Sequence, residues 1–332
     1  MVELYPLLMS PVFDPRPWGT ENLAPIYPNH TFAEKIGETW LTGSDNKVAD
    51  GPLAGKSLGE LTAEYGRKLV GRSAPDAAVF PLLLKFLFPE DKLSVQVHPG
   101  DEQAREDGLP CGKTECWYVA HARPGAQVAI GLKPGITRND LREAILQNHA
   151  EEILNWVNVY PGEMIYVPGG TVHTMAAGSV LVETQQQSDT TYRLYDYGRE
   201  RELHLDKGLA AVREEAAAGK VIRPAPTALN GNGSTRSPLV RSRCFTVEML
   251  HLKGEYLVEQ EDTASSSVQI LVAVDGFGAV DVEGMPPQTF AKGQAVVIPA
   301  SIPAFRIRPQ WSVEVLRAFV SNGVTAEPAV RR

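Results

Sequence analysis

Near its middle the chain reads Gly162-Glu-Met-Ile-Tyr-Val-Pro168-Gly-Gly170-Thr-Val-His173. A glycine turn precedes a short apolar strand, a Pro-x-Gly turn ends it, and a histidine follows after two further residues. Two turns this close together fix where the strand enters and leaves its sheet, so His173 is expected to point inward from the neighbouring strand. The stretch therefore predicts a histidine metal ligand inside a β-barrel.

A second stretch with the same spacing lies near the C-terminus and reads Gly293-Gln-Ala-Val-Val-Ile-Pro-Ala-Ser-Ile-Pro-Ala304. When the two stretches are aligned, their glycines and prolines coincide and Ala304 falls on His173. Internal self-similarity of this kind indicates a repeated domain. Because alanine replaces the histidine, the second copy is predicted to lack the metal ligand.

The chain as a whole has the composition of an ordinary globular protein of 332 residues. Its net charge of −8 argues against general binding to nucleic acids or membrane surfaces, which are themselves anionic. It has no apolar run long enough to span a bilayer, and its N-terminus has no basic start followed by an apolar stretch. The three cysteines form no Cys-x-x-Cys pair, so we expect a reduced, cytoplasmic protein without a signal peptide.

Short strand-like runs dominate the chain and are separated by many glycine and proline breaks. Four of these runs are Leu93 to Val97, Glu115 to Val119, Met164 to Val167 and Val180 to Thr184. Three helices are expected: from the capping box at Ser57 to Leu69, from Thr137 toward Gln147, and from Asp206 to Ala218, with Gly219 as a stop. The predicted fold class is mainly β, with a few helices packed on the N-terminal half.

A polar, flexible stretch between Pro224 and Ser234 is the best candidate for a domain boundary. It predicts a catalytic domain at 1–222, a linker at 223–238 and a C-terminal domain at 239–332. Because the second copy of the repeat lies in the last of these, the C-terminal domain is expected to share the barrel fold without a metal site.

Upstream of His173, two predicted strands carry polar residues at alternate positions. Gln96 and His98 share one face of the first strand, and apolar valines occupy the other face. Lys113 and Glu115 share one face of the next strand. Two imidazoles, a carboxylate and an amide oxygen form a donor set that suits a borderline divalent ion, with zinc as the leading choice.

Downstream of His173, further charged residues follow an apolar strand. Glu183 ends that strand, where partial desolvation would raise the pKa of its carboxyl group. Arg193 and Arg199 supply positive charge in a segment that also bears Asp189 and Asp196. The segment is open to two interpretations, as part of an active site or as a solvated loop held by salt bridges.

The motifs resemble those of a known family. Gly-x5-Pro-x-Gly-x2-His is the second motif of the cupin fold, a small jelly-roll barrel, although Ala177 stands where that motif usually has asparagine. The order Gln-x-His-Pro, Lys-x-Glu, His, Glu and Arg is similar to that of type I mannose-6-phosphate isomerases in their short bacterial form. Further matches are Pro11-Val-Phe, Trp18-Gly19, Ile36-Gly-Glu-Thr-Trp40, Gly51-Pro-Leu-Ala-Gly-Lys56 and Pro81-Leu-Leu-Leu-Lys-Phe86. The resemblance covers most of the chain and implies two cupin (jelly-roll) barrels.

The resemblance also implies an activity, the reversible isomerisation of mannose 6-phosphate and fructose 6-phosphate through a cis-enediol(ate). The implied ligands of one zinc ion per chain are Gln96, His98, Glu115 and His173. The implied catalytic residues are Arg193, Lys113 and Glu183. The implied phosphate-binding residues are Lys85, Ser94 and Arg199, the last at a position where other members have lysine.

Several alternatives stay open at this point. The proton-transfer base is Glu183, Lys113 or a metal-bound water. The partner is expected to be a small sugar phosphate, with neither nucleic acid nor membrane, and the chain is expected to be a monomer or a weak homo-oligomer. Two rival functions are a metal-dependent cupin oxygenase and a non-catalytic sugar-phosphate-binding cupin. Gln96 as a fourth ligand argues against the first, and the retained Arg193 argues against the second.

Overall fold

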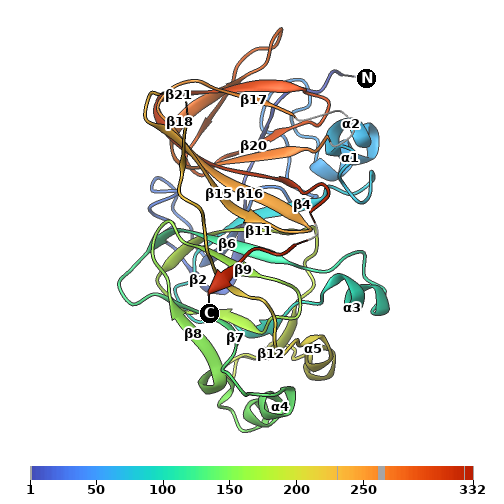
Figure 1. Cartoon of the computed structure of the whole chain (residues 1–332), viewed down its shortest axis with the longest axis vertical. Helices are drawn as coiled ribbons and strands as arrows, with labels where there is room; N and C mark the ends of the chain where they lie inside the picture. The colour runs from blue at the N-terminus through green and yellow to red at the C-terminus, as the bar shows by residue number, and fades with distance from the viewer. Residues whose placement is uncertain (1, 230, 261–265, 325, 332) are drawn as a thin grey trace.

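The computed structural model describes residues 2–229, 231–260, 266–324 and 326–331. Its strands form three antiparallel sheets, so the predicted mainly β class is confirmed. In Figure 1 most of the C-terminal strands form the upper part of the molecule, and most strands of the first two thirds of the chain form the lower part, where the C-terminus also lies. Within the described residues, no helix is long and apolar enough to cross a membrane.

Two sheets make up the lower part, which we call the N-terminal unit. Within the described residues, the larger sheet has the order β2 (Val12–Thr20), β3 (Ile36–Trp40), β4 (Leu82–Leu87), β11 (Ser179–Gln186), β6 (Glu115–Ala122), β9 (Met164–Val167), β13 (Gly219–Val221) and β22 (Val330–Arg331). The smaller has the order β12 (Tyr192–Tyr195), β5 (Val95–Val97), β10 (His173–Met175), β7 (Gln127–Leu132) and β8 (Leu154–Asn158). All four predicted strands are present: β9 has the predicted bounds, and the bounds of the other three differ by a few residues.

One sheet makes up the upper part, which we call the C-terminal unit. Within the described residues, its main path is β1 (Leu7–Met9), β20 (Ala295–Ile298), β18 (Gln269–Asp281), β21 (Ala304–Val320), β16 (Phe245–Leu252), β15 (Ser234–Arg241) and β14 (Thr227–Leu229). β17 (Tyr256–Glu259) pairs with β21, and β19 (Gln288–Ala291) pairs with β18. Register shifts interrupt the long β18–β21 pairing. Bulges of this kind bend a strand, so one strand serves two parts of the sheet.

The helices match the prediction from Thr137 toward Gln147 but differ from the bounds of the other two predicted helices at breaks in the backbone. They are α1 (Leu58–Tyr65), α2 (Arg67–Val70), α3 (Asp101–Glu106), α4 (Arg138–Leu146) and α5 (Leu205–Ala211), with a 3-10 turn at Ala150–Ile153. The capping boxes at Ser57 and Thr137 are both formed. The first predicted helix is split in two because Gly66 adopts φ of +52°. α2 lies against the C-terminal unit, where its carbonyls at Leu69 and Val70 accept backbone hydrogen bonds.

The prediction of a helix from Asp206 to Ala218 is wrong in its second half. Val212 is extended and buried, and the N–H of Arg213 donates to the carbonyl of Gly170. Burial of Val212 and this tertiary hydrogen bond replace the last helical turns. Gly219 is therefore the first residue of β13 rather than a helix stop.

The two units exchange strands at both ends of the chain. β1 pairs with β20 in the C-terminal sheet, and β22 pairs with β13 in the N-terminal sheet. The predicted linker 223–238 is not free, because it contains β14 and the first half of β15, which pair with each other, and β15 pairs with β16. The segments on either side of the predicted boundaries at 222 and 239 therefore contribute strands to each other's sheets. The three-part division stays a prediction.

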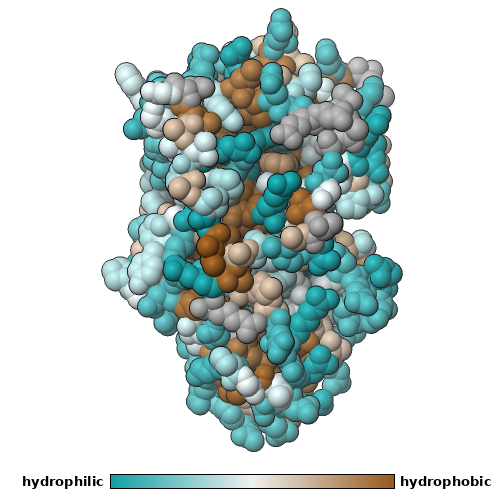
Figure 2. Space-filling model, viewed as in Figure 1, coloured by the Kyte–Doolittle hydropathy of each residue, from teal (hydrophilic) through white to brown (hydrophobic). Residues whose placement is uncertain are grey.

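Alternation along the central strands decides which side chains reach the interior of the N-terminal unit. Phe86 and Val182 belong to the apolar core that also contains Leu316 of the C-terminal sheet. Their strand neighbours Lys85 and Glu183 face the other way and line a cavity. The face in Figure 2 is mostly hydrophilic, with hydrophobic residues gathered near the middle, where the units meet.

Candidate active site

The cavity opens between the two sheets of the N-terminal unit and has a volume of about 430 Å³. Its lining includes six of the residues predicted from the sequence: Lys85, Ser94, Gln96, Lys113, Glu183 and Arg193. These residues come from β4, β11, β5 and β12 and from the segments leading into β5 and β6. The predicted residues are thus brought together although they span more than a hundred positions of the chain.

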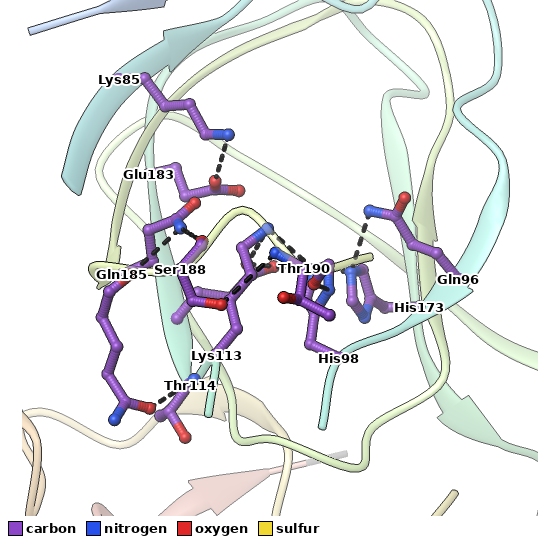
Figure 3. A network of polar contacts seen from close by, with 12 residues as sticks. Lys85, Gln96, His98, Lys113, Thr114, His173, Glu183, Gln185, Ser188 and Thr190 are labelled. Atoms are coloured by element: carbon purple, nitrogen blue, oxygen red, sulfur yellow. Dashed lines mark hydrogen bonds and ion pairs between the residues drawn. The ribbon is translucent and has the colours of Figure 1, made fainter. Parts of the chain in front are cut away.

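Three fully buried side chains lie beside this cavity and could hold a metal ion. The donor atoms of His98, Glu115 and His173 all lie within 4.8 Å of one another. Glu115 Oε1 is 3.5 Å from His173 Nε2, and Glu115 Oε2 is 3.4 Å from His98 Nε2. Figure 3 shows the two histidines beside Gln96 and Lys113. The two turns predicted on either side of β9 are present, because Gly162 and Gly170 adopt φ of +84° and +91°.

Both imidazoles are oriented by backbone carbonyls. His98 Nδ1 lies 2.9 Å from the carbonyl oxygen of Thr190, and His173 Nδ1 lies 2.9 Å from that of Thr171. A proton on Nδ1 leaves the lone pair of Nε2 directed at the centre. Burial lowers the pKa of His98 to about 3, with the neighbouring Lys113 adding to the effect, and burial also lowers the pKa of His173. Both rings are therefore neutral near pH 7 and can act as ligands.

The third donor carries the negative charge. Burial opposes ionisation of Glu115, but Lys113, His98 and His173 together outweigh it and hold the pKa of the carboxyl well below its usual range. Its Oε2 is buried without a hydrogen bond, although Lys113 Nζ lies 3.3 Å away. A buried carboxylate oxygen without a hydrogen bond, beside two Nε2 lone pairs, fits a divalent cation.

Gln96 completes the predicted donor set from the edge of the cavity. Its amide nitrogen lies 3.2 Å from His173 Nε2, and Ser94 Oγ donates to its Oε1 at 3.3 Å. A half-turn of the amide exchanges nitrogen for oxygen and would direct an oxygen donor at the same centre. The register of β10 against β5, which pairs His173 with Gln96, keeps the two side chains adjacent.

A chain of buried charges extends from this centre across the larger sheet. Trp117 Nε1 donates to Glu115 Oε1 at 3.0 Å and to Glu183 Oε2 at 3.1 Å. Lys85 Nζ lies 3.3 Å from both Glu183 and Glu38, as drawn in part in Figure 3. We refer to Glu38, Lys85 and Glu183 as the N-terminal triad.

The triad sets the ionisation of its members. Burial, followed by the charge of Glu115, raises the pKa of Glu183 to about 7. Burial also opposes the charge on Glu38, but Lys85 and Arg16 outweigh it and lower its pKa to about 2. Burial alone would lower the pKa of Lys85, yet the two carboxylates raise it. Glu183 is consequently a buried carboxyl group that exchanges its proton near neutral pH.

The arginines divide into those that line the cavity and one that does not. Arg193 lines it, donates through Nη1 to the carbonyl of Glu202 at 2.9 Å, and has a buried Nε without a hydrogen-bond partner. Arg199 is not among the lining residues, because it pairs with Asp196 at 3.0 Å and donates to the carbonyl of Lys92. Arg201 lines the cavity and binds the same Asp196 through two nitrogens.

Sequence reasoning missed four lining or supporting residues. These are Arg16, Glu38, Trp117 and Arg201. Trp117 could have been found, because it lies two residues after Glu115 and so shares its face of the strand. Glu38 lies in the matched stretch Ile36–Trp40, but no local pattern placed it or Arg16 at the cavity, since their position depends on how β2 and β3 pair with the rest of the sheet.

The fold and the site define a class: a mainly β enzyme of cupin-like type, with buried donors suited to a metal ion beneath a charged cavity. Residues 9–110 match the family model of the type I phosphomannose isomerase catalytic domain. The chain is 33% identical to the mannose-6-phosphate isomerase of Streptococcus mutans over 312 residues, which cover 91% of this chain and 94% of the relative. It is also 33% identical to mannose-6-phosphate isomerase ManA of Bacillus subtilis, with coverage of 91% and 95%.

A solved structure gives the same result. The crystal structure of the mannose 6-phosphate isomerase from Bacillus subtilis matches with a TM-score of 0.83 at 30% identity, over 94% of this chain and 99% of that one. The chain belongs to the mannose-6-phosphate isomerase family, and the family predicted from the sequence is confirmed.

Proposed function

We propose that this chain is a zinc-dependent aldose–ketose isomerase that interconverts mannose 6-phosphate and fructose 6-phosphate. Family membership supports the reaction. The observation that carries the proposal is the convergence, on one cavity, of a His–Glu–His donor set, a carboxyl group with a pKa near neutrality and an arginine. Those are the parts that a proton transfer next to a carbonyl group requires.

His98, Glu115 and His173 would hold the ion, with Gln96 as a fourth ligand. The two imidazole nitrogens, one carboxylate and one amide oxygen suit zinc in preference to harder ions, which favour oxygen alone. When bound, the ion would supply Lewis acidity beside the oxygen atoms of the substrate. The single carboxylate leaves the ion a net positive charge.

Glu183 is our candidate for the proton carrier. The isomerisation moves a hydrogen between carbons 1 and 2, and one carboxylate above the plane of a cis-enediol(ate) can take the proton from one carbon and return it to the other. A pKa near 7 balances these two roles because the group is neither a very weak base nor a very weak acid at neutral pH. Lys113 stays the second candidate, since its Nζ lies 3.1 Å from His98 Nε2 and also lines the cavity.

Arg193 would stabilise the negative charge that develops on the oxygen atoms of the enediolate. Its Nε is buried without a partner, so one donor is available without breaking an existing hydrogen bond. For the phosphate group we retain Lys85 and Ser94, which line the cavity, and replace Arg199 by Arg201. Because Arg201 already binds Asp196 through Nε and Nη2, its Nη1 is the nitrogen that would donate a charge-assisted hydrogen bond to the phosphate.

A coupled assay that follows fructose 6-phosphate formation from mannose 6-phosphate tests the reaction. We expect saturable turnover of the zinc-loaded protein and none with the unphosphorylated sugar at the same concentration. Binding of mannose 6-phosphate without turnover would instead support a non-catalytic cupin. Oxygen consumption with an iron-loaded protein, in the absence of isomerisation, would support the oxygenase alternative.

A further inference from the structure

The C-terminal unit has a cavity of its own, of about 390 Å³, at the place that corresponds to the active-site cavity. The correspondence follows from strand pairing. β9 ends at Val167, which lies opposite Glu115, and β20 ends at Ile298, which lies opposite Gln269. Because β9 and β20 are the strands of the two repeated motifs, Gln269 occupies the place of Glu115.

The same registers identify the other counterparts of the metal ligands. His173 pairs with Gln96, and Ala304 pairs with Glu259. The C-terminal counterparts of Gln96, Glu115 and His173 are therefore Glu259, Gln269 and Ala304. The counterpart of His98 lies outside the described residues. Three of the four donor positions have changed, so these counterparts do not repeat the His–Glu–His donor set. The absence of a metal site in the second copy stays a prediction.

The N-terminal triad also has a counterpart. On β11, Glu183 lies two residues before the partner of Glu115, and on β21, Arg317 lies two residues before the partner of Gln269. Lys85 pairs with Glu183, and Glu248 pairs with Arg317. On the next strand of each sheet, Glu38 pairs with Leu87, two residues after Lys85, and Arg236 pairs with Leu250, two residues after Glu248. Arg236 therefore occupies the place of Glu38.

The two triads carry opposite charges. Glu–Lys–Glu in the N-terminal unit becomes Arg–Glu–Arg in the C-terminal unit, at Arg236, Glu248 and Arg317. Glu248 is buried, and its two oxygens accept from Arg317 Nη1 and Arg236 Nε at 2.6 Å each. Arg317 Nε donates to Gln269 Oε1 at 2.6 Å, so the counterpart of the metal-binding carboxylate now anchors an arginine.

This cavity has the charge balance of an anion site. Among the described lining residues, the three arginines Arg236, Arg241 and Arg317 exceed the two glutamates by one positive charge. Hydrogen-bonding side chains, among them Thr246 and Asn322, complete the wall. Arginines held by a buried carboxylate are fixed in direction before a ligand arrives, which lowers the entropy lost on binding.

We propose that the C-terminal cavity binds a small oxyanion that also carries hydroxyl groups, such as a phosphorylated or carboxylated sugar. The oxyanion would contact Arg236, Arg241 and Arg317, and the amide and hydroxyl side chains would bind the polyol. This site is separate from the catalytic cavity, and the proposal does not depend on the isomerase activity.

Isothermal titration of the zinc-loaded chain with inorganic phosphate, fructose 6-phosphate and gluconate tests the proposal. We expect gluconate to bind one site with salt-sensitive affinity, and phosphate and fructose 6-phosphate to bind two sites per chain, one of which is the catalytic cavity. Arg241→Glu reverses one charge at an exposed position and should weaken the C-terminal site at least tenfold. Arg236→Gln should do the same, and both variants should keep the turnover of the parent chain.

Arg308→Ala is the matched control. Arg308 pairs with Asp281 in the same unit, outside the cavity, so its loss removes one positive charge without touching the lining. We expect the control to bind as the parent does. A single fructose 6-phosphate site per chain, together with no saturable binding of gluconate, would overturn the proposal. Equal binding by Arg241→Glu, in a chain whose melting curve is unchanged, would overturn it as well.

Discussion

The two cavities of this chain occupy equivalent places in paired strands, yet one is built around Glu38–Lys85–Glu183 and the other around Arg236–Glu248–Arg317. In the first, a carboxyl group lies beside a His–Glu–His centre and has a raised pKa. In the second, an arginine takes the place of that carboxyl group, and the metal-ligand positions hold Glu259, Gln269 and Ala304. The shared backbone arrangement therefore determines where a cavity forms, and the side chains that line the cavity determine its chemistry.

The largest effect on turnover is expected from the proposed metal ligands. Glu115→Gln removes the only carboxylate of the donor set and should lower kcat/KM by more than about a thousandfold, together with the bound metal, as measured by coupled assay and elemental analysis. Gln269→Glu, at the equivalent C-terminal position, keeps an acceptor for Arg317 and should leave turnover unchanged. A Glu115→Gln protein that retains both metal and turnover would remove this residue from the site.

The next effect concerns the proton carrier. Glu183→Gln keeps the shape and the contact with Trp117 but cannot accept a proton, so kcat should fall by about a hundredfold or more. Arg317→Lys changes the equivalent residue of the C-terminal unit and keeps its charge, and it should not affect kcat. Turnover retained within a few-fold in Glu183→Gln would transfer the proton-transfer role to Lys113.

The pH dependence gives an independent check of Glu183. Because burial raises its pKa to about 7, the carboxyl group is protonated below that pH and cannot accept a proton from the substrate. The kcat/KM for mannose 6-phosphate should therefore rise as pH increases through about 7. The Glu183→Gln variant should lose this dependence, and a parent profile that is flat across this range would contradict the assignment.

A smaller effect is expected from substitutions in the two triads, which separate the contribution to stability from the contribution to catalysis. Lys85→Met leaves two buried carboxylates without their shared cation and should reduce the free energy of unfolding by about 3–5 kcal/mol, measured by urea denaturation. Glu248→Gln disrupts the matching C-terminal triad and should also destabilise the chain. Only Lys85→Met should lower kcat/KM, since only its triad faces the proposed active site. A matching loss of turnover in Glu248→Gln would contradict this separation.

The smallest effect on KM is expected for Arg199, whose predicted role in phosphate binding the structure does not favour. Arg199 lies outside the lining, and its ion pair with Asp196 is partly exposed. Arg199→Ala should change KM by no more than about fivefold, because such pairs contribute about 1 kcal/mol or less. Arg201→Ala should raise KM more than that. The reverse order would restore Arg199 as the phosphate-binding residue.

Much of this site was readable from the sequence because its signals are local. Period-two alternation placed Gln96 with His98 and Lys113 with Glu115, and the spaced glycine and proline turns directed His173 inward. The capping box at Ser57 and the start of a helix at Thr137 depend only on neighbouring residues, so they too were predicted correctly.

The features that the sequence did not predict depend on contacts between segments that are far apart in the chain. The contacts of Arg201 and Arg199 differ because of where the chain turns after β12, and no local pattern distinguishes two arginines that are two residues apart. The exchange of β1 and β22 between units is likewise set by sheet edges far away in sequence. α5 ends early because burial of Val212 outweighs local helix preference.

The central claim is that His98, Glu115 and His173 hold the metal on which isomerisation depends. The most direct test is the turnover of mannose 6-phosphate by the chain after chelation, verified by elemental analysis, and again after addition of one equivalent of zinc. The account predicts loss of turnover on metal removal and recovery at a ratio of one zinc per chain. Full turnover by the verified metal-free chain would contradict it.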